Sequence, residues 1–394
     1  MLDPDLSPAE VAALWAKLGY SKADANDLKA LPIPVLSRLG NLEGVDYWAR
    51  DTANRVVLDS MITAAEKRLR ELEASTAYDA GGSQYATAWK NLTALKEICT
   101  AANETANGGK RFVTMLRDDE VPPLAAVSIG DLDTATNVTW AVPGMGTDTT
   151  GMTGWTDAAQ NIWNEQAKHH GPVDRAVVSW VGYDTPPQPV IHGQLDFGVL
   201  GSSYAEAGGD ALADALRGLD AVRGDDSFAE HVVAHSYGST TASYALTERG
   251  VHVDSFTTVG SAGIPNSVPN ADALHADHMY AGQAQNIWIP EPGRGDRWAQ
   301  TGRLSFVHSQ DPTDPDFGAT AFGTDGVDGK PELNSVDDHS VHTDELRGYL
   351  DPNTEALSNI GWATTGRPER MTEHHPKGMT EWEKTVLEQI QGQP

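Results

Sequence analysis

The sequence predicts an α/β protein with a doubly wound, mostly parallel sheet and a helical N-terminal region. From about residue 124, short apolar and β-branched runs alternate with helical stretches, as in strand–helix–strand units. The strand-like runs are apolar on both sides, which places helices on both faces of the sheet. The first 120 residues show the spacing of amphipathic helices instead.

The helical region opens with a clear start signal. Ser7 is placed to cap a helix, Pro8 takes its first position, and Glu10 follows three residues after the cap. Longer amphipathic runs cover residues 45–75 and 83–103. These runs predict long helices ahead of the sheet.

We expect two domains, a helical region over residues 1–120 and an α/β domain over residues 121–394. The expected strands of the second domain each stop at turn residues: LAAVSIG, NVTWAVPG, RAVVSWVGY, FAEHVVAHS, VDSFTTVGSAG and HMYAGQA. The helical stretches between them are TDAAQNIWNEQAKHH, YAEAGGDALADALRGL and STTASYALTERG. From about residue 290 the chain is rich in Gly, Pro and Asp, which predicts long functional or mobile loops. A further helix is expected near residues 353–361, followed by an amphipathic tail.

Composition narrows the class of protein. The chain has 394 residues, a net charge of −28 and a pI of about 4.6. A nucleic-acid backbone or an anionic membrane surface is therefore an unfavourable partner, and no apolar run reaches the length of a membrane span. The single cysteine, Cys99, permits no intramolecular disulfide, and its helical apolar surroundings predict a small buried side chain. The start of the chain lacks the features of a signal peptide, which favours a cytoplasmic location, with export by a signal-independent route as the alternative.

One strand-to-helix junction has the pattern of a nucleophile turn. The run VVAHSYGSTTASYAL passes from an apolar strand through Ser236 into a helix. Such a turn is sharp, so the residues two before and two after the serine must be small, and here they are Ala234 and Gly238. Ser236 is predicted to be a nucleophile, and the Tyr237 N–H one donor of an oxyanion hole. The alternative is an ordinary turn with a capping serine.

A second oxyanion donor is expected in the loop after the strand over residues 137–142. This loop reads Pro143-Gly144-Met145-Gly146, and its glycines allow backbone N–H groups to face a ligand. The N–H of Met145 or of Gly146 is the candidate. The alternative is a simple strand-to-helix turn that needs glycine for geometry alone.

A base and an acid should follow in the order nucleophile, acid, histidine. His339 lies in a loop after the strand-like run FGATAF and is the preferred base, with His342 as the alternative. The acid is less obvious, because the tip of HMYAGQA carries no carboxylate. We prefer Asp311 and then Asp296, although either residue also suits an ordinary turn. The other carboxylates considered are Glu291, Asp314 and Asp316.

Taken together, the motifs resemble an α/β-hydrolase family of unknown function, found mainly in actinobacteria and their phages, with a helical N-terminal segment. The resemblance covers most of the chain. The motifs that carry it, in order, are LWAKLG…LKALPIPVLSRLGNLEGVDYWARDTANRVVL, AAVSIGDLDTATNVTWAVPGMGT, AVVSWVGYDTP, VVAHSYGSTT, VGSAGI, DPTDPDFGA, DDHS and GYLDPNTEALSNIGWATTG.

The resemblance implies a serine hydrolase with Ser236 as nucleophile and His339 as base. Two departures from the family pattern matter. Ala234 stands where the family usually has glycine, and Asn286 and Ile287 stand where an aspartate usually follows the penultimate strand. The triad is therefore completed from another loop or impaired. Asp311 belongs to the Asp-Pro motif of the family, which ranks it above Asp296.

The favoured function is hydrolysis of a small acyl ester of short or medium chain length through an acyl-enzyme, with no metal or cofactor. The alternative from another class is a catalytically impaired hydrolase fold that serves as a binding module. A third reading is a calcium loop in DPTDPDFG, which lacks the Gly and Glu of a recognised calcium loop. The RGD at residues 294–296 is a chance match. Aromatic residues expected near the active-site edge, as pocket lining or as core, are Trp155, Trp180, Tyr183, Trp288 and Trp298.

Overall fold

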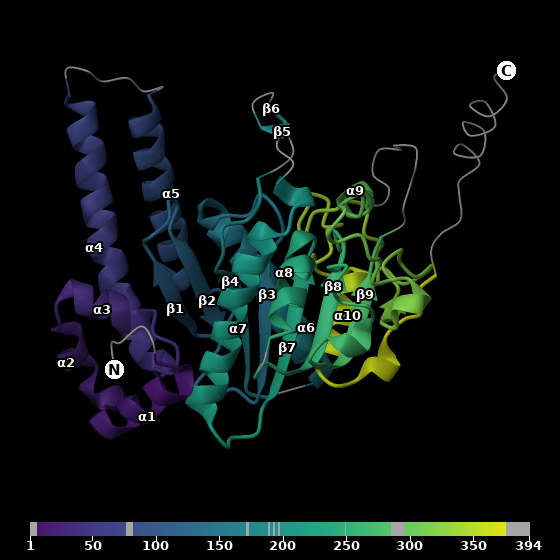
Figure 1. The fold of residues 1–394 in the computed structure, drawn as a ribbon, viewed down its shortest axis with the longest axis horizontal. Helices are drawn as coiled ribbons and strands as arrows, with labels where there is room; N and C mark the ends of the chain where they lie inside the picture. The colour runs from purple at the N-terminus through teal and green to yellow at the C-terminus, as the bar shows by residue number, and fades with distance from the viewer. Residues whose placement is uncertain are drawn as a thin grey trace.

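An eight-stranded sheet forms the centre of the molecule (Figure 1). The computed structural model describes residues 6–375 except 76–81, 171–172, 188–189, 192–193, 196–197, 249 and 285–295. The strand order is β1-β2-β4-β3-β7-β8-β9-β10, and β5 and β6 form a separate pair. From β4 to β10 all neighbours are parallel, whereas the β1–β2 and β2–β4 pairs are antiparallel. The predicted mostly parallel, doubly wound sheet is thereby confirmed.

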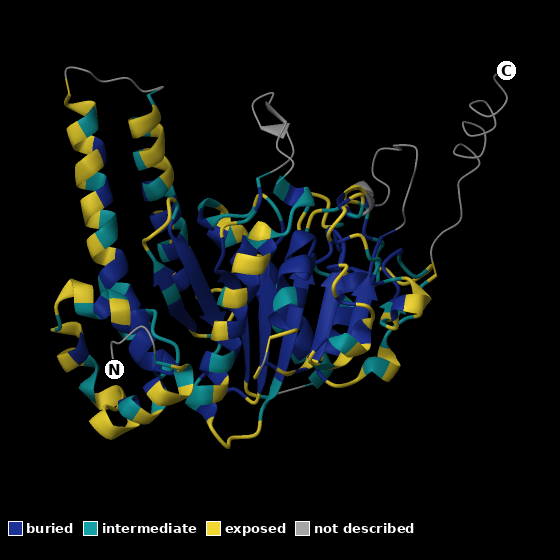
Figure 2. Ribbon diagram, in the orientation of Figure 1, coloured by how far each residue is buried: buried dark blue, intermediate teal, exposed yellow. Residues whose placement is uncertain are grey.

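The expected strands are all present, and β1 and the two-residue strands β5 and β6 are additional. Their bounds are β1 Arg111–Arg117, β2 Leu124–Ile129, β3 Asn137–Val142, β4 Arg175–Val181, β5 Val190–Ile191, β6 Gln194–Leu195, β7 Ala229–His235, β8 Val253–Val259, β9 Ala276–Gly282 and β10 Thr320–Phe322. The central strands are buried along their whole length, which Figure 2 shows as a continuous dark-blue sheet. Burial on both faces explains why these runs are uniformly apolar rather than alternating.

Helices cover both faces of the sheet. Their bounds are α1 Pro8–Leu18, α2 Ala25–Lys29, α3 Ile33–Gly40, α4 Tyr47–Glu73, α5 Ser83–Asn103, α6 Met152–His170, α7 Ser203–Arg223, α8 Tyr237–Ala245, α9 Arg297–Gly302 and α10 Glu355–Ala363. Strand β4 shows how the faces divide, because Val177 and Val181 pack toward α6 while Val178 and Trp180 pack toward α7. The sheet therefore separates two apolar layers.

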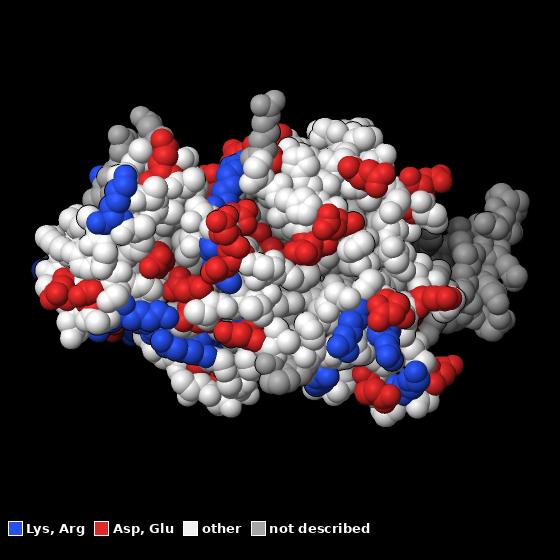
Figure 3. Space-filling view, turned by 90° about the horizontal axis from the view of Figure 1, so that it is seen from below, with Lys and Arg blue, Asp and Glu red and all other residues white. Residues whose placement is uncertain are grey.

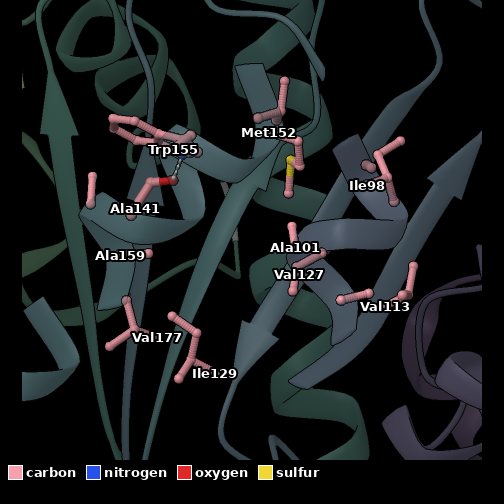
Figure 4. Close-up of a cluster of buried hydrophobic side chains, with 14 of the residues drawn as sticks. Ile98, Ala101, Val113, Val127, Ile129, Ala141, Met152, Trp155, Ala159 and Val177 are labelled. Atoms are coloured by element: carbon pink, nitrogen blue, oxygen red, sulfur yellow. Dashed lines mark hydrogen bonds between the residues drawn. The ribbon is translucent and has the colours of Figure 1, made fainter. Parts of the chain in front are cut away.

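The N-terminal helices share a core with the sheet. Figure 4 shows Ile98 and Ala101 of α5 packed with Val113 of β1, Val127 of β2 and Met152 of α6. Cys99, expected to be buried, lies half-buried in α5 and packs against this core. The upper halves of α4 and α5 extend beyond the sheet as a pair of largely exposed helices (Figures 1 and 2).

Strand β1 corrects one expectation from the sequence. Arg111–Arg117 was predicted to belong to the helical region, but it pairs antiparallel with β2 at the edge of the sheet. The run RFVTMLR is rich in apolar and β-branched residues and too short for a helical repeat, which suits an edge strand better than a helix. The division into domains at residue 120 stays a prediction.

The start of α1 follows the predicted capping pattern. The Ser7 Oγ accepts a hydrogen bond from the Glu10 N–H at 3.4 Å, and the Ser7 N–H donates to Glu10 Oε2 at 2.9 Å. Pro8 occupies the first turn, and Gly19 ends the helix with a φ of +68°. The local signals in the sequence are thus sufficient to set both ends of this helix.

Charges on the surface are mixed. Figure 3 shows Lys and Arg side chains lying among Asp and Glu side chains on the face opposite the carboxyl ends of the parallel strands. Of the helices in the described ranges, none combines the length and the apolarity needed to cross a membrane. The predicted exclusion of nucleic acid as a partner remains an inference from net charge.

An ion pair between the buried Arg50 and Glu43, whose side chain is 20% exposed, joins α4 to the segment after α3, and its loss should be costly. Arg50, 2% exposed, makes two hydrogen bonds to the Glu43 carboxylate, at 2.5 and 2.8 Å. Arg50→Met leaves the Glu43 charge without its partner, so the free energy of unfolding should fall by about 3–5 kcal/mol. Denaturant unfolding at pH 7 measures this. Arg70→Met, which removes an exposed partner 3.9 Å from Glu66, is the matched control and should change stability by under about 1 kcal/mol. Equal losses in the two variants would contradict the account.

Candidate active site

The predicted sharp strand-to-helix turn at Ser236 is present between β7 and α8. Ser236 has a φ of +55° and a ψ of −128°, a strained conformation for a residue with a side chain. Its backbone is held on both sides, because its N–H donates to the Val259 carbonyl at 3.0 Å and its carbonyl accepts from the Ala262 N–H at 3.3 Å. The surrounding strands therefore fix the direction of the Ser236 side chain.

Close packing explains the small residues around the turn. A Cβ at Gly238 would lie 2.5 Å from the Pro143 carbonyl oxygen, so no larger residue fits there without a shift. A Cβ at Gly144 would lie 2.6 Å from the Ser236 Cβ. The loop after β3 therefore lies directly against the nucleophile turn, as an oxyanion loop requires. Ala234, where glycine was expected from the resemblance, is fully buried.

Three side chains from distant segments form a continuous hydrogen-bonded row. His339 Nε2 lies 2.8 Å from the Ser236 Oγ, and His339 Nδ1 lies 2.8 Å from Asp296 Oδ1. His339 comes from the loop after β10, and Asp296 directly precedes α9. The geometry is that of a nucleophile, a base and the carboxylate that orients the base.

The carboxylate in this row is Asp296, the second choice from the sequence. The expected contact between Asp311 and His339 is corrected, because Asp311 binds the Arg303 guanidinium and also accepts from the Thr313 N–H at 2.8 Å. These are the contacts of a turn residue. The sequence did not distinguish the two aspartates because both lie in loops with the same local turn chemistry.

Asp296 is held in its charged form. Burial by itself would raise the pKa of this fully buried carboxyl, but the facing His339 and several hydrogen bonds lower the pKa below its usual range. The donors are the Ala299 N–H to Oδ1 and the Tyr349 hydroxyl to Oδ2, each at 2.9 Å. Both oxygens are therefore fixed, and so is the ring that Oδ1 faces.

The other predicted base and acid candidates that the structure describes bind partners other than Ser236 and His339. His342 Nδ1 pairs with Asp351 Oδ1 at 2.5 Å, and its side chain is 61% exposed. Asp314 caps the short turn that contains Asp316 by accepting the Asp316 N–H at 2.9 Å. Glu291 lies outside the described residues. Among the residues that the structure describes, no group of three or more His, Cys, Asp or Glu side chains is arranged to hold a metal ion.

The structure distinguishes between the two predicted oxyanion donors of the loop after β3. The Gly146 N–H, one of the two predicted donors, donates to the Pro186 carbonyl at 2.9 Å. Because this N–H already has an acceptor, the prediction of Gly146 as an oxyanion donor is corrected. The Met145 N–H, one residue closer to Gly144, is the remaining candidate in that loop. Tyr237 is the first residue of α8, and the first N–H groups of a helix have no acceptor within the helix.

His235 is a site residue that the sequence analysis missed. Its Nε2 lies 2.6 Å from the His339 carbonyl oxygen, and the two imidazole rings are 4.8 Å apart. Burial, assisted by the neighbouring His339, lowers the pKa of His235 to about 3, so the ring is neutral and its Nε2–H donates. His235 thus ties the loop of His339 to the end of β7. The one signal in the sequence that could have identified His235 is its position directly before Ser236.

The low pKa of His235 predicts acid sensitivity. A histidine in the unfolded chain binds a proton near pH 6.5, whereas folded His235 binds one only near pH 3. The unfolded state therefore gains the proton first, and stability falls as the pH drops from about 6.5 toward 3. His235→Asn keeps a donor but does not titrate, so the slope of unfolding free energy against pH should decrease by about 1.4 kcal/mol per pH unit there. Denaturant unfolding between pH 7 and 5 tests this, and an unchanged slope contradicts it.

The aromatic residues expected near the site divide between core and surface. Trp155 and Trp180 are buried, and the Trp155 Nε1–H donates to the Ala141 carbonyl (Figure 4). The Tyr183 hydroxyl donates to the Pro143 carbonyl at 2.8 Å and so supports the loop beside Ser236. Trp298 is 43% exposed, and Trp288 lies outside the described residues.

The sheet order, the strained serine after β7 and the histidine after the last strand define an α/β-hydrolase fold. Residues 118–294 match the model of a family described as alpha/beta hydrolase. This agrees with the family resemblance inferred from the motifs, while its link to phages stays a prediction.

Relatives and solved structures give no activity for this chain. Uncharacterized proteins from two strains of Mycobacterium tuberculosis are each 27% identical over 363 residues, covering 84% of this chain and 52% of the relative. The chain thus spans about half the length of the curated relatives it matches. An esterase of Pyrobaculum calidifontis is 14% identical, covering 76% of this chain and 97% of its own, with a TM-score of 0.36. A ferulic acid esterase from Anaeromyces mucronatus is 12% identical, covering 68% and 94%, with a TM-score of 0.34.

Proposed function

We propose that the chain is a serine hydrolase that cleaves carboxylic esters through an acyl-enzyme. The observation that carries the proposal is the hydrogen-bonded row from the Ser236 Oγ through His339 to Asp296, with 2.8 Å at each step. The strained backbone of Ser236 supports it, because such strain in a well-packed turn is typical of a functional residue.

Each residue has a defined task in acylation. His339 Nε2 takes the proton of the Ser236 hydroxyl while Oγ forms a bond to the ester carbonyl carbon. The carbonyl oxygen becomes an oxyanion, which the N–H groups of Tyr237 and Met145 stabilise. Asp296 stabilises the imidazolium that forms on His339 without taking its proton. His339 then gives the proton to the alkoxide as the carbon–oxygen bond breaks, and the alcohol leaves.

Deacylation uses the same groups with water as the nucleophile. His339 takes a proton from water, whose oxygen attacks the acyl carbon, and the same two N–H groups hold the second oxyanion. The bond to the Ser236 Oγ breaks, and His339 returns the proton to that oxygen. A carboxylic acid leaves, and the enzyme is restored. Loss of one oxyanion donor typically costs about 3 kcal/mol of transition-state stabilisation.

The alternative of a non-catalytic binding module has lost its main support. It rested on the absence of an obvious acid for His339 and on a helical N-terminal region that could dock a partner, and the 2.8 Å contact of Asp296 Oδ1 with His339 Nδ1 removes the first of these grounds. The row of hydrogen bonds is therefore complete, and we favour an enzyme that acts on esters of short or medium acyl chains.

Labelling with a fluorophosphonate probe tests this proposal. The expected result is rapid labelling of one site per chain, with the adduct on the peptide that contains Ser236 and no labelling of Ser236→Ala. Ser267→Ala removes an exposed serine and is the matched control, which should label at the wild-type rate. A folded wild-type chain that does not label, or a Ser236→Ala variant that labels normally, would end the proposal.

A further inference from the structure

One short segment connects the loop of His339 with Asp296. Residues 348–351 read Gly-Tyr-Leu-Asp and begin the last motif of the family resemblance, and the proposed mechanism gives this motif no task. The Tyr349 N–H donates to the Ser340 carbonyl at 3.0 Å, and Ser340 directly follows His339. The backbone of Tyr349 therefore closes the loop that carries His339.

Asp351 holds the rest of this loop together. Its carboxylate is fully buried and accepts the N–H groups of Thr343 at 3.0 Å and of Gly348 at 2.7 Å. It also lies 2.5 Å from His342 Nδ1. A Cβ at Gly348 would lie 2.4 Å from the Val341 carbonyl carbon, so the two sides of the loop are in direct contact. The loop thus has little freedom to move relative to Tyr349.

The Tyr349 side chain reaches from this loop to Asp296. The side chain is fully buried, and its hydroxyl donates to Asp296 Oδ2 at 2.9 Å. The same oxygen accepts the Ala284 N–H at 2.8 Å, which leaves its own proton for the carboxylate. Burial raises the pKa of the Tyr349 hydroxyl well above its usual value, and the charge of Asp296 acts in the same direction. The hydroxyl therefore stays a donor.

Asp296 Oδ2 depends on this hydroxyl. Oδ1 faces His339 Nδ1 and accepts the Ala299 N–H, whereas Tyr349 is the one donor to Oδ2 in the described part of the chain. Gly260, at the end of β8, makes room for this contact, because a Cβ there would lie 2.7 Å from Oδ2 and 2.9 Å from Tyr349 Cε2. Loss of the hydroxyl would leave a buried carboxylate oxygen unpaired.

Four other titratable groups lie close to this cluster: Arg303, Asp325, His235 and Asp338. The Arg303 guanidinium binds Asp311 and Gln283, and the neutral His235 ring donates to the His339 carbonyl. Among the described residues, none of the four makes a hydrogen bond to Asp296. The role of the Tyr349 hydroxyl is therefore not duplicated.

We propose that Tyr349 is a positioning residue for ester hydrolysis: its backbone fixes the His339 loop and its hydroxyl holds the Asp296 carboxylate, which keeps base and acid aligned. Tyr349 acts through Asp296 and does not contact Ser236. The inference rests on the proposed function, because alignment of His339 and Asp296 matters only if they serve catalysis at Ser236. It also gives the motif at residues 348–351 a task.

Tyr349→Phe removes the hydroxyl and keeps the buried ring. In hydrolysis of p-nitrophenyl acetate, kcat should fall about 10- to 100-fold, as expected for a lost hydrogen bond to a charged group. KM should change less than about twofold, because the hydroxyl contacts the enzyme's own carboxylate. The matched control is Tyr47→Phe, which removes a hydroxyl from a buried ring in α4 and should keep the wild-type kcat. A wild-type kcat in Tyr349→Phe would overturn the inference.

The pH profile separates positioning from a loss of packing. Removing a donor from the carboxylate makes the pair of His339 and Asp296 bind a proton more readily. The acid limb of kcat/KM should therefore move to higher pH in Tyr349→Phe, by roughly half a pH unit or more, and should stay in place in Tyr47→Phe. A lower rate with an unmoved acid limb would mean a merely structural role and would overturn the proposal.

A double-mutant cycle shows whether Tyr349 acts through Asp296. In the Asp296→Asn background the carboxylate is absent, so Tyr349→Phe should slow fluorophosphonate labelling less than about threefold. In the wild-type background the same substitution should slow labelling about 10- to 100-fold. All rates are measured well below the melting temperature of each variant. Equal losses in the two backgrounds contradict the assignment.

Labelling of the wild-type chain distinguishes the two possible failures. If the wild type labels at Ser236 and Tyr349→Phe matches it in rate and in pH profile, the proposed function stands and the positioning role is wrong. If the folded wild-type chain does not label, the proposed function is wrong, and the role of Tyr349 falls with it.

Discussion

Ser236→Ala is expected to lower kcat for ester hydrolysis about 10⁶-fold, leaving only the residual rate that an oxyanion hole and substrate binding supply. In the proposed mechanism the Ser236 Oγ forms the covalent bond. The neighbouring Ser239 cannot replace it, because Ser239 is fully buried and its hydroxyl is bonded to the Ser236 carbonyl and to Ser261. The substitution removes one oxygen and leaves the backbone bonds of the turn in place, so the melting temperature should change little. Hydrolysis of p-nitrophenyl acetate measures the rate, with Ser267→Ala as the control. Retention of more than about 1% of kcat by the alanine variant contradicts the assignment.

Asp296→Asn should lower kcat about 10⁴-fold, whereas Asp311→Asn should lower it less than about tenfold. The asparagine amide donates toward His339 Nδ1, which favours the tautomer with the proton on Nε2. That nitrogen then faces the Ser236 hydroxyl as a donor and accepts no proton from it. Asp311 contacts Arg303 and Thr313 instead of His339, so its replacement affects only a loop.

Stability must be followed in the same two variants. Asp296 also caps α9 and accepts the Tyr349 hydroxyl, so Asp296→Asn lowers the melting temperature as well as the rate. The loss of kcat should persist well below the melting temperature, where the chain is fully folded. An Asp311→Asn variant with the larger loss would show that Asp311 is the functional acid after all.

The fold, Ser236 and His339 could be predicted from the sequence. Strand runs, turn residues and helix caps follow from short-range chemistry, and the serine turn shows its small flanking residues directly. His339 was predictable because only its order after the last strand had to be known. The strands, the helix caps and the serine turn depend on neighbours within a few residues, where patterns in the sequence are strongest, whereas His339 required only the chain order of the fold.

The acid depended on tertiary structure. Asp296 follows the last residue of β9, Gly282, by fourteen positions, and α9 and Tyr349 orient it from outside its own loop. The contact between His235 and His339 likewise joins residues 104 positions apart. The choice between Met145 and Gly146 turned on a single backbone bond to Pro186. No local pattern contains these contacts.

Strand β1 was missed for a related reason. Its sequence is short and follows two long helices, so the helical spacing before it dominated the prediction. Its assignment as a strand comes from pairing with β2, a partner that only the folded sheet provides.

The most direct test of the central claim is to trap the acyl-enzyme. The chain is mixed with p-nitrophenyl acetate, quenched in acid within milliseconds, and digested for mass spectrometry. The account predicts an acetyl group on the peptide that contains Ser236, formed far more slowly in Asp296→Asn than in Asp311→Asn. Acetylation of a different residue during full turnover, or equal acetylation rates in the two aspartate variants, would contradict it.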